Sequence, residues 1–168
     1  MLYKKIIGEA KIHSDLENVE KQIELLKSEG KTIVFTNGCF DMLHLGHIEY
    51  LLRASLMGDV MIVGVNSDDS IKGLKGSNRP IMNEEHRYHL MASLSFIDMV
   101  IPFNEETPYN VIKSVKPDVL VKGAGYKEEE IVGYDIVKEI GGVTTIVETN
   151  LPPSLYSTTS IIEKIKKL

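Results

Sequence analysis

The sequence predicts a doubly wound α/β fold built on a parallel five-stranded sheet, and two observations lead to this prediction. First, five short runs that are apolar on both faces recur from residue 31 onward, as in strands of a parallel sheet. Second, the segments between them carry apolar residues at helical spacing, which is typical of crossover helices. Folds of this kind bind ligands beyond the carboxyl ends of the strands, where the strand order reverses.

The five predicted strands are short, and the chain between them is long enough for crossover connections. They are TIVF (32–35), VMIVGV (60–65), MVIPF (99–103), DVLVKG (118–123) and VTTIVE (143–148).

A first helix is expected over residues 14–29. Ser14 and Glu17 have the spacing of a capping box, and Gly30 follows the end of the helix. One face of this segment is apolar, through Leu16, Val19, Ile23 and Leu26. This pattern predicts a helix that packs against the sheet.

Further helices are expected between the strands and at the carboxyl end. One apolar stripe comprises Ile48, Leu51, Leu52 and Leu56, and another comprises Leu90, Leu94 and Ile97. The terminal segment STTSIIEKIKKL is expected to form a helix with a hydroxyl cap and lysines in its last turn.

Length, composition and charge limit the possible protein classes. A chain of 168 residues with 43% hydrophobic and 26% charged residues predicts one domain over 1–168, with 1–30 as an N-terminal helical extension. The formal charge of -5 argues against nonspecific nucleic-acid binding. Cys39 is the only cysteine, the first residues lack a secretory signal, and no apolar run reaches membrane-spanning length. We therefore expect a cytoplasmic protein without membrane contact.

Residues 66–83 form the longest stretch without strong periodicity, so we expect a loop there. It carries Lys72, Lys75 and Arg79 among Gly73, Gly76 and Pro80. In a compact domain, such a loop is usually functional or mobile.

The segment NGCFDMLHLGH, residues 37–47, joins the first strand to the next helix and concentrates polar groups at the carboxyl edge of the sheet. His44 and His47 are three residues apart, so a first helical turn brings both imidazoles to one side. Gly46 permits close approach of another group, and a helix N-terminus favours an anion. The segment predicts a phosphate site.

Two other interpretations of this segment remain open. Cys39, Asp41, His44 and His47 are all possible zinc ligands, although structural zinc sites usually pair cysteines from two segments. Alternatively, Asn37 and Asp41 only cap the helix and satisfy strand-end backbone groups, which explains the histidines poorly.

The sequence His44-Leu45-Gly46-His47 resembles the His-x-Gly-His signature of the nucleotidyltransferase superfamily, which includes the cytidylyltransferases. The segments TNGCFDMLHLGH, VNSDDSIKGLKG, NRPIMNEEHR, DVLVKGAGYKEEEIVG and STTSII occur in the order seen in bacterial D-glycero-β-D-manno-heptose 1-phosphate adenylyltransferases. This resemblance covers roughly residues 30 to 168 and implies a Rossmann-like nucleotidyltransferase fold. Because the length leaves no room for the sugar kinase often fused to this domain, it suggests a stand-alone form.

The resemblance implies adenylyl transfer from ATP to a sugar 1-phosphate, with Mg²⁺ accompanying the ATP. It suggests catalytic roles, as phosphate-contacting donors, for His44, His47, Lys72 and Lys75. The lysines could instead be solvated surface residues.

The same resemblance implies two binding sets. Nucleotide-binding residues are expected at Asn37, Gly38, Cys39, Phe40, Gly46, Ser157, Thr158 and Thr159. Acceptor- or phosphate-binding residues are expected at Asp41, Asn66, Arg79, Arg87, Lys122 and Gly123.

Several of these positions have an alternative role. Phe40 suits the core, and Asp41 could orient a histidine, cap the helix or, third, bind a metal. Arg87 could form an ordinary helix ion pair with Glu84. A plain N-cap would need only one hydroxyl of the Ser157 segment.

The chain departs from the family pattern at Gly125. Members commonly show Lys-Gly-x-Asp-Tyr, whereas this chain has Lys122-Gly123-Ala124-Gly125-Tyr126. The change suggests an altered acceptor, a different metal arrangement, or a carboxylate supplied by Asp98 or Glu128. The resemblance assigns no magnesium ligand in this chain.

Other activities also fit the sequence. Cytidylyl transfer to glycerol 3-phosphate or another alcohol phosphate would keep the chemistry and change the substrates. A nucleotide-binding sensor module without catalysis would fit the loss of a carboxylate at Gly125. A homodimer is compatible with the resemblance, with contacts from the N-terminal helix or the 99–110 region.

Overall fold

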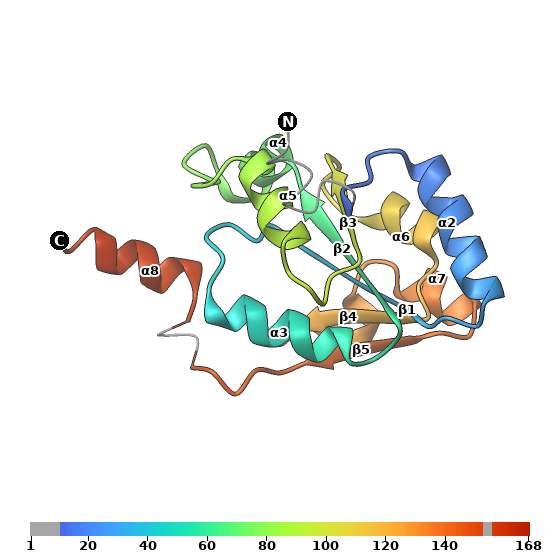
Figure 1. Ribbon diagram of the computed structural model, residues 1–168. Coiled ribbons are helices and arrows are strands. Elements are labelled where there is room, and N and C mark those ends of the chain that lie inside the picture. Colours follow the sequence, from blue (N-terminus) through green and yellow to red (C-terminus); the bar gives the residue numbers. More distant parts are fainter. Residues whose placement is uncertain (1–10, 153–155) are drawn as a thin grey trace.

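The computed structural model describes residues 11–152 and 156–168 and contains a parallel sheet of five strands in the order β3-β2-β1-β4-β5 (Figure 1). The strands are β1 (Ile33–Gly38), β2 (Val60–Asn66), β3 (Met99–Phe103), β4 (Val119–Gly123) and β5 (Val143–Val147). All four strand pairs are parallel. The predicted fold class and all five predicted strands are therefore confirmed.

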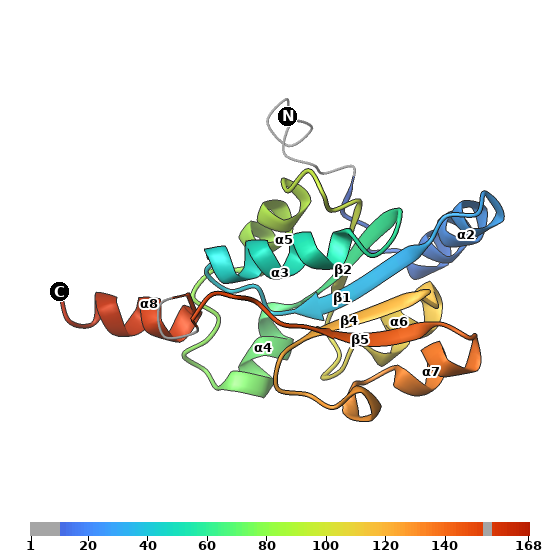
Figure 2. The ribbon, with the colours of Figure 1, turned by 90° about the horizontal axis from the view of Figure 1, so that it is seen from below.

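Helices cover both faces of the sheet (Figures 1 and 2). They are α2 (Leu16–Ser28), α3 (Leu45–Ser55), α4 (Asp68–Lys75), α5 (Glu84–Ala92), α6 (Tyr109–Val115), α7 (Tyr134–Glu139) and α8 (Thr158–Ile165), with a short 3₁₀ turn η2 (Glu128–Glu130). Within the described residues, no helix has the length and apolar character that a bilayer span requires.

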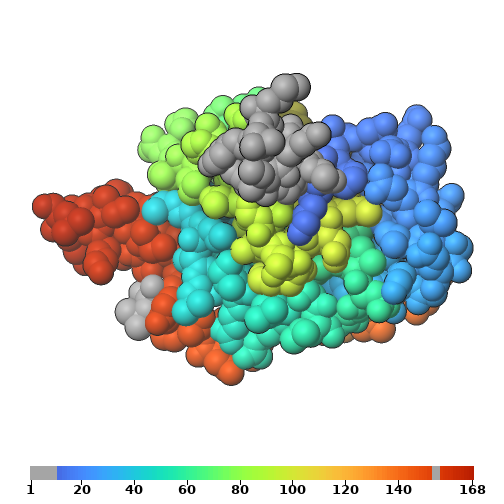
Figure 3. All heavy atoms as spheres, in the orientation of Figure 1, coloured from blue at the N-terminus to red at the C-terminus, as the bar shows by residue number. Residues whose placement is uncertain are grey.

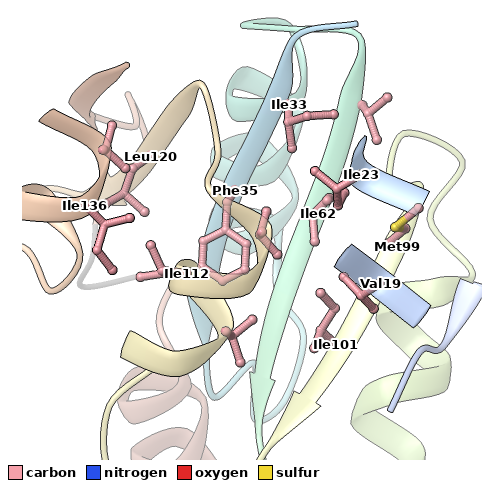
Figure 4. Packing of buried hydrophobic residues seen from close by; sticks show 14 of the residues in the cluster. Val19, Ile23, Ile33, Phe35, Ile62, Met99, Ile101, Ile112, Leu120 and Ile136 are labelled. Atoms are coloured by element: carbon pink, nitrogen blue, oxygen red, sulfur yellow. The ribbon is translucent and has the colours of Figure 1, made fainter. Parts of the chain in front are cut away.

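Two apolar clusters hold these layers together. On one face, buried side chains of α2, α6 and α7 pack against the sheet around Phe35 and Ile62, as Figure 4 shows. On the other face, Leu51 of α3 and Met91 of α5 pack against Val63. Because both faces are covered, the strands are apolar on both sides, which is the pattern their sequences predict.

The sheet order reverses between β1 and β4. The chain proceeds outward from β1 through β2 to β3, and then crosses back to β4 and β5 on the other side of β1. The carboxyl ends of β1 and β4 therefore diverge into connections that leave in opposite directions. This is the topological switch point at which the fold binds ligands.

Two local predictions need correction. The N-cap of α2 is Asp15 rather than Ser14, because the Asp15 carboxylate accepts the amides of Glu17 and Asn18. Residues 66–83 are not a continuous loop, since α4 occupies Asp68–Lys75. The apolar spacing on this eight-residue helix is too sparse for a strong periodic signal.

Candidate active site

Two adjoining cavities lie at the switch point. We call the first, of about 190 Å³, the β1 cavity, because its wall includes the end of β1 and the segment that follows. We call the second, of about 260 Å³, the β5 cavity, because its wall includes the end of β5. His47, Tyr50 and Gly123 line both cavities, so these three residues mark the junction between them.

Most of the predicted site residues line these cavities. The β1 cavity contains Asn37, Gly38, Cys39, Phe40, Asp41, His47, Lys75, Arg79, Lys122, Gly123 and Thr158, and the β5 cavity contains His44, Gly46, His47 and Gly123. These residues come from segments more than 100 positions apart in the chain, which the parallel sheet brings to one edge.

The two histidines stack at the start of α3. His44 is the N-cap, and its Nδ1 accepts the amide of His47 at 3.3 Å. Their ring centroids lie 3.7 Å apart. Burial, then the neighbouring His44 and Lys75, lowers the pKa of His47 to about 4, and burial lowers the pKa of His44. The lowered pKa values favour neutral imidazoles near pH 7, in which one ring nitrogen carries a hydrogen and the other can accept a hydrogen bond.

The glycines of this segment allow close packing within the protein. A Cβ at Gly46 would lie 2.8 Å from the carbonyl oxygen of Tyr156, and a Cβ at Gly38 would lie 3.1 Å from the ring of Phe40. Gly46 therefore lets the chain before α8 approach α3, in addition to any approach by a phosphate. Phe40 is 4% exposed and belongs to the core, although its ring also borders the β1 cavity.

Asp41 is 2% exposed, and its carboxylate is fully engaged. It accepts hydrogen bonds from the amides of Ile81 and Met82 and from Arg79, whose Nε and Nη2 lie 2.8 and 2.7 Å from Oδ2. Burial raises the pKa of Asp41, but these amides and the guanidinium outweigh it and hold the pKa below its usual value. The carboxylate therefore orients Arg79, and it neither orients a histidine nor caps α3.

The structure does not bring Arg87 or Asn66 into either cavity. Arg87 is completely buried and donates to the carbonyl oxygens of Cys39, Asn66 and Met82 and to the carboxylate of Asp68. The Asn66 amide nitrogen donates to Ser70. The alternative ion pair of Arg87 is also not formed, since the Glu84 carboxylate accepts the Asp68 amide.

The three lysines predicted for the site have different surroundings. Lys75 lines the β1 cavity, whereas Lys72 is exposed and pairs with Asp69 at 2.8 Å. Lys122 Nζ donates to Asn37 Oδ1 at 2.8 Å. Burial lowers the pKa of Lys122 to about 8, with the Cys39 thiol opposing the shift. Within the described part of the chain, Lys122 has no carboxylate at ion-pair distance, so an anion in the cavity would be its natural partner.

The C-terminal helix presents its N-terminus to the β1 cavity. Ser157 is the N-cap and forms a capping box with Ser160. The Thr158 hydroxyl donates to the main-chain oxygen of Asp41 at 2.7 Å and lines the cavity, whereas Thr159 is exposed. Of the three predicted hydroxyl residues, Thr158 is the one that lies at the cavity.

Sequence reasoning missed Tyr50 and most of the β5 cavity. The Tyr50 hydroxyl contacts Thr36 Oγ1 at 2.6 Å and donates to the carbonyl oxygen of Val121, and burial raises its pKa. Its position three residues after His47 on α3 is a signal that could have identified it. The other wall of the β5 cavity consists of Ala124, Val147, Thr149, Leu151 and Tyr156, for which the sequence offered no motif.

The backbone at Gly125 has a φ of +98°, which L-residues with side chains rarely adopt. Of the substitutes proposed for a carboxylate here, Asp98 lies at the opposite edge of the sheet, where it accepts the amide of Met61 at the start of β2. Glu128 is exposed on η2. No group of three metal-ligating side chains occurs among the residues that the structure describes, so zinc held by the protein does not fit them.

The sequence model of the cytidylyltransferase-like family matches residues 35–164. The chain therefore belongs to this family, and its enzyme class is that of a nucleotidyltransferase, as the His-x-Gly-His sequence predicted. Family and fold agree, because the match begins in β1 and ends in α8.

Two curated proteins are similar to this chain over most of its length. The chain is 52% identical to the bifunctional protein HldE of a Nitratiruptor species over 152 residues, which are 90% of this chain and 31% of that protein. It is 48% identical to the bifunctional protein HldE of Helicobacter pylori (strain J99) over 155 residues, which are 92% of this chain and 32% of that protein. The chain thus spans about a third of the length of these curated relatives.

Solved structures support the same fold. The lipopolysaccharide core biosynthesis protein from Thermoplasma volcanium GSS1 superimposes with a TM-score of 0.59 at 29% identity, covering 73% of this chain and 99% of that chain. A pantoate-beta-alanine ligase from Francisella tularensis reaches a TM-score of 0.63 at 17% identity, covering 94% and 72%, and shows the fold alone.

Proposed function

We propose that the chain transfers the adenylyl group of ATP to D-glycero-β-D-manno-heptose 1-phosphate, giving ADP-heptose and pyrophosphate for lipopolysaccharide precursors. The observation that carries this proposal is the pair of cavities that meet at His47, Tyr50 and Gly123. Such a junction is what group transfer between two substrates requires. Identity of about half the aligned residues with the HldE proteins supports the heptose substrate.

The two cavities differ in chemistry, and this supports an assignment of the substrates. The β1 cavity carries Lys75, Arg79 and Lys122 together with the N-terminus of α8, which suits phosphate groups. The β5 cavity is bordered by Val147, Leu151 and Tyr156 and suits the nucleoside of ATP.

In the proposed reaction, a phosphate oxygen of the sugar attacks the α-phosphorus of ATP in line. The bond from the α-phosphorus to the bridging oxygen breaks, and pyrophosphate leaves with that electron pair. No covalent intermediate on the protein is needed, so the residues act by positioning and by stabilising charge. The neutral imidazoles of His44 and His47 would donate hydrogen bonds to the phosphates, and Lys75 and Lys122 would supply positive charge.

Magnesium enters this proposal as the companion of the triphosphate. Mg²⁺ usually binds through substrate phosphates, waters and one or two carboxylates. Among the described residues that line the β1 cavity, Asp41 carries the one carboxylate, and this carboxylate already accepts hydrogen bonds on both oxygens. The described residues therefore fit an ion carried by ATP better than an ion held in a protein cage.

The proposed function also implies a cellular compartment and binding partners. We propose that residues 1–168 act as one nucleotidyltransferase domain in the cytoplasm, with ATP and a sugar 1-phosphate as partners and without nucleic acid or membrane. A homodimer is part of the proposal, and the N-terminal helix and the 99–110 region are its candidate contacts.

The test is pyrophosphate release in the presence of Mg²⁺, with ATP or CTP against heptose 1-phosphate or glycerol 3-phosphate. Release is expected with ATP and heptose 1-phosphate. The rate of release should fall by roughly 10²-fold or more when His44 and His47 are both replaced by Ala. His86→Ala, a change at an exposed histidine of α5, is the matched control.

Other outcomes would redirect the proposal. Release with CTP and glycerol 3-phosphate would identify the alternative cytidylyltransferase. Nucleotide binding without release from any pair would favour the sensor module, for which glycine in place of a carboxylate at position 125 is the specific observation.

A further inference from the structure

Asp41 joins three segments that the sequence keeps far apart. Its carboxylate holds Arg79 and the amides that precede α5, and its main-chain oxygen accepts the hydroxyl of Thr158 at the start of α8. Arg79 and Thr158 both line the β1 cavity, yet the hydrogen bonds of both lead to Asp41 rather than to each other. A displacement of Asp41 would therefore move both Arg79 and Thr158.

The backbone at Asp41 has little freedom to shift. Its two neighbours, Phe40 and Met42, have φ values of 48° and 58°, in the left-handed region that residues with side chains rarely occupy. Such conformations persist only where surrounding contacts determine them, and they cluster at functional sites. The Phe40 ring is fixed in the core, so the carbonyl and the carboxylate of Asp41 have defined directions.

The helix at the other end of this connection is loosely attached. In Figures 1 and 3, α8 projects from the body of the protein, and none of its residues is buried. The hydrogen bond from Thr158 to Asp41 is therefore a principal tie between the N-terminus of α8 and the rest of the described chain.

We infer that Asp41 is a positioning residue that couples the guanidinium of Arg79 to the N-terminus of α8, so that both close together on the phosphates of the bound nucleotide. Asp41 itself touches no substrate in this scheme. The inference rests on the proposed function insofar as the ligand is a nucleoside triphosphate.

The test is a double-mutant cycle on binding of the magnesium complex of α,β-methylene-ATP, measured by calorimetry on the full chain. Arg79→Gln and Thr158→Val are made singly and together. Because both groups act through Asp41, the combined loss of affinity should differ from the product of the single losses by roughly twofold or more. Thr158→Ser, which keeps the hydroxyl, should restore the wild-type response to Arg79→Gln.

Thr159→Val is the matched control, since Thr159 is exposed and follows Thr158 on the same helical turn. Its effect should simply multiply with that of Arg79→Gln. If the effects of Arg79→Gln and Thr158→Val multiply in the same way, the coupling through Asp41 is refuted while the proposed function stands. If the intact protein binds no nucleotide, the proposed function and the inference both fail. Because binding is measured without turnover, these failures are distinguishable.

Discussion

At the scale of single residues, burial sets the charge of the groups at the cavity junction. The same loss of water that keeps His47 neutral also makes the ammonium of Lys122 costly, because burial disfavours the charged form of either base. The outcome differs because their ordinary pKa values differ. His47 is a neutral donor at pH 7, whereas Lys122 still carries most of its charge and begins to lose it near pH 8.

Phosphate affinity should therefore depend on pH through Lys122. With a pKa of about 8, Lys122 is protonated below this pH and loses its proton above it, so binding of a sugar phosphate should weaken as the pH rises from 7 to 9. Since each lost proton removes one ion pair, the Kd should rise by up to about tenfold per pH unit above the pKa. Calorimetric titration at several pH values measures this.

Two variants separate Lys122 from its neighbours. Lys122→Met should bind weakly, with little change over the same pH range. Cys39→Ser removes the thiol that opposes the lowering of the Lys122 pKa, so its pH profile should keep the same form and move to somewhat lower pH. An unchanged profile in Lys122→Met would show that another group titrates.

The lowered pKa of His47 also affects stability. Because its pKa in the folded state is about 4 and its ordinary value is 6.5, the unfolded chain binds a proton that the folded chain rejects between these values. This contribution is present above pH 6.5 and is lost as the pH falls toward 4. His47→Asn should therefore lose less stability than the intact protein between pH 7 and pH 5, by up to about 2 kcal/mol.

Urea unfolding at the two pH values measures this difference. His86→Asn replaces an exposed histidine and should follow the intact protein. Equal losses in all three proteins would mean that His47 is protonated in the folded state.

At the scale of elements, loops of this protein use side chains to start neighbouring strands. Asp59 and Asp118 accept the amides of Thr32 and Ile33 at the beginning of β1, and Asp98 accepts the amide at the beginning of β2. These aspartates satisfy edge amides at the end of the sheet opposite to the cavities. The carboxyl end of the sheet is thereby left for ligand contacts. There the carboxylate of Asp41 binds Arg79 and the amide of Met82 and so holds the loop before α5 in place.

The contact between α3 and the segment before α8 gives a prediction at this scale. Gly46→Ala places a Cβ 2.8 Å from the Tyr156 carbonyl oxygen and 3.1 Å from the His44 ring. Since backbone must move to relieve this contact, nucleotide affinity should fall by about tenfold or more while the sheet stays folded. Nucleotide titration and circular dichroism measure the two effects.

The matched control is Gly73→Ala on α4, where a Cβ meets nothing within 4 Å. Alanine inside a helix should stabilise the protein by about 0.5–1 kcal/mol without a large change in affinity. If Gly46→Ala behaves like this control, α8 is not held against α3 in the way the structure indicates.

At the scale of the whole molecule, the sequence predicted the parts of the structure that depend on local pattern. The five strands followed from the apolar runs, and the gathering of polar residues at the carboxyl edge of the sheet followed from the residues at the strand ends. The partners of Asp41 and Arg87 did not follow, because Arg79 and Cys39 lie 38 and 48 positions away from them and sheet register brings them together. The helix α4 escaped prediction for the opposite reason, since its eight residues give too few apolar repeats.

Arg87 illustrates how the carboxyl edge of the sheet is held as one unit. Its guanidinium links the end of β1 at Cys39, the end of β2 at Asn66 and the start of α4 at Asp68. It carries a full charge with no solvent exposure, so its hydrogen bonds must compensate the loss of hydration.

Replacing Arg87 by Met should therefore destabilise the protein by about 3–5 kcal/mol, because three carbonyl groups and a carboxylate lose their donor. Urea unfolding of the full chain measures the change. The control is Arg53→Met, which removes the partly exposed ion pair between Arg53 and Glu49 on α3. That loss should be about 0.5 kcal/mol or less. Similar losses in both variants would mean that the buried hydrogen bonds of Arg87 do not unite the ends of β1 and β2.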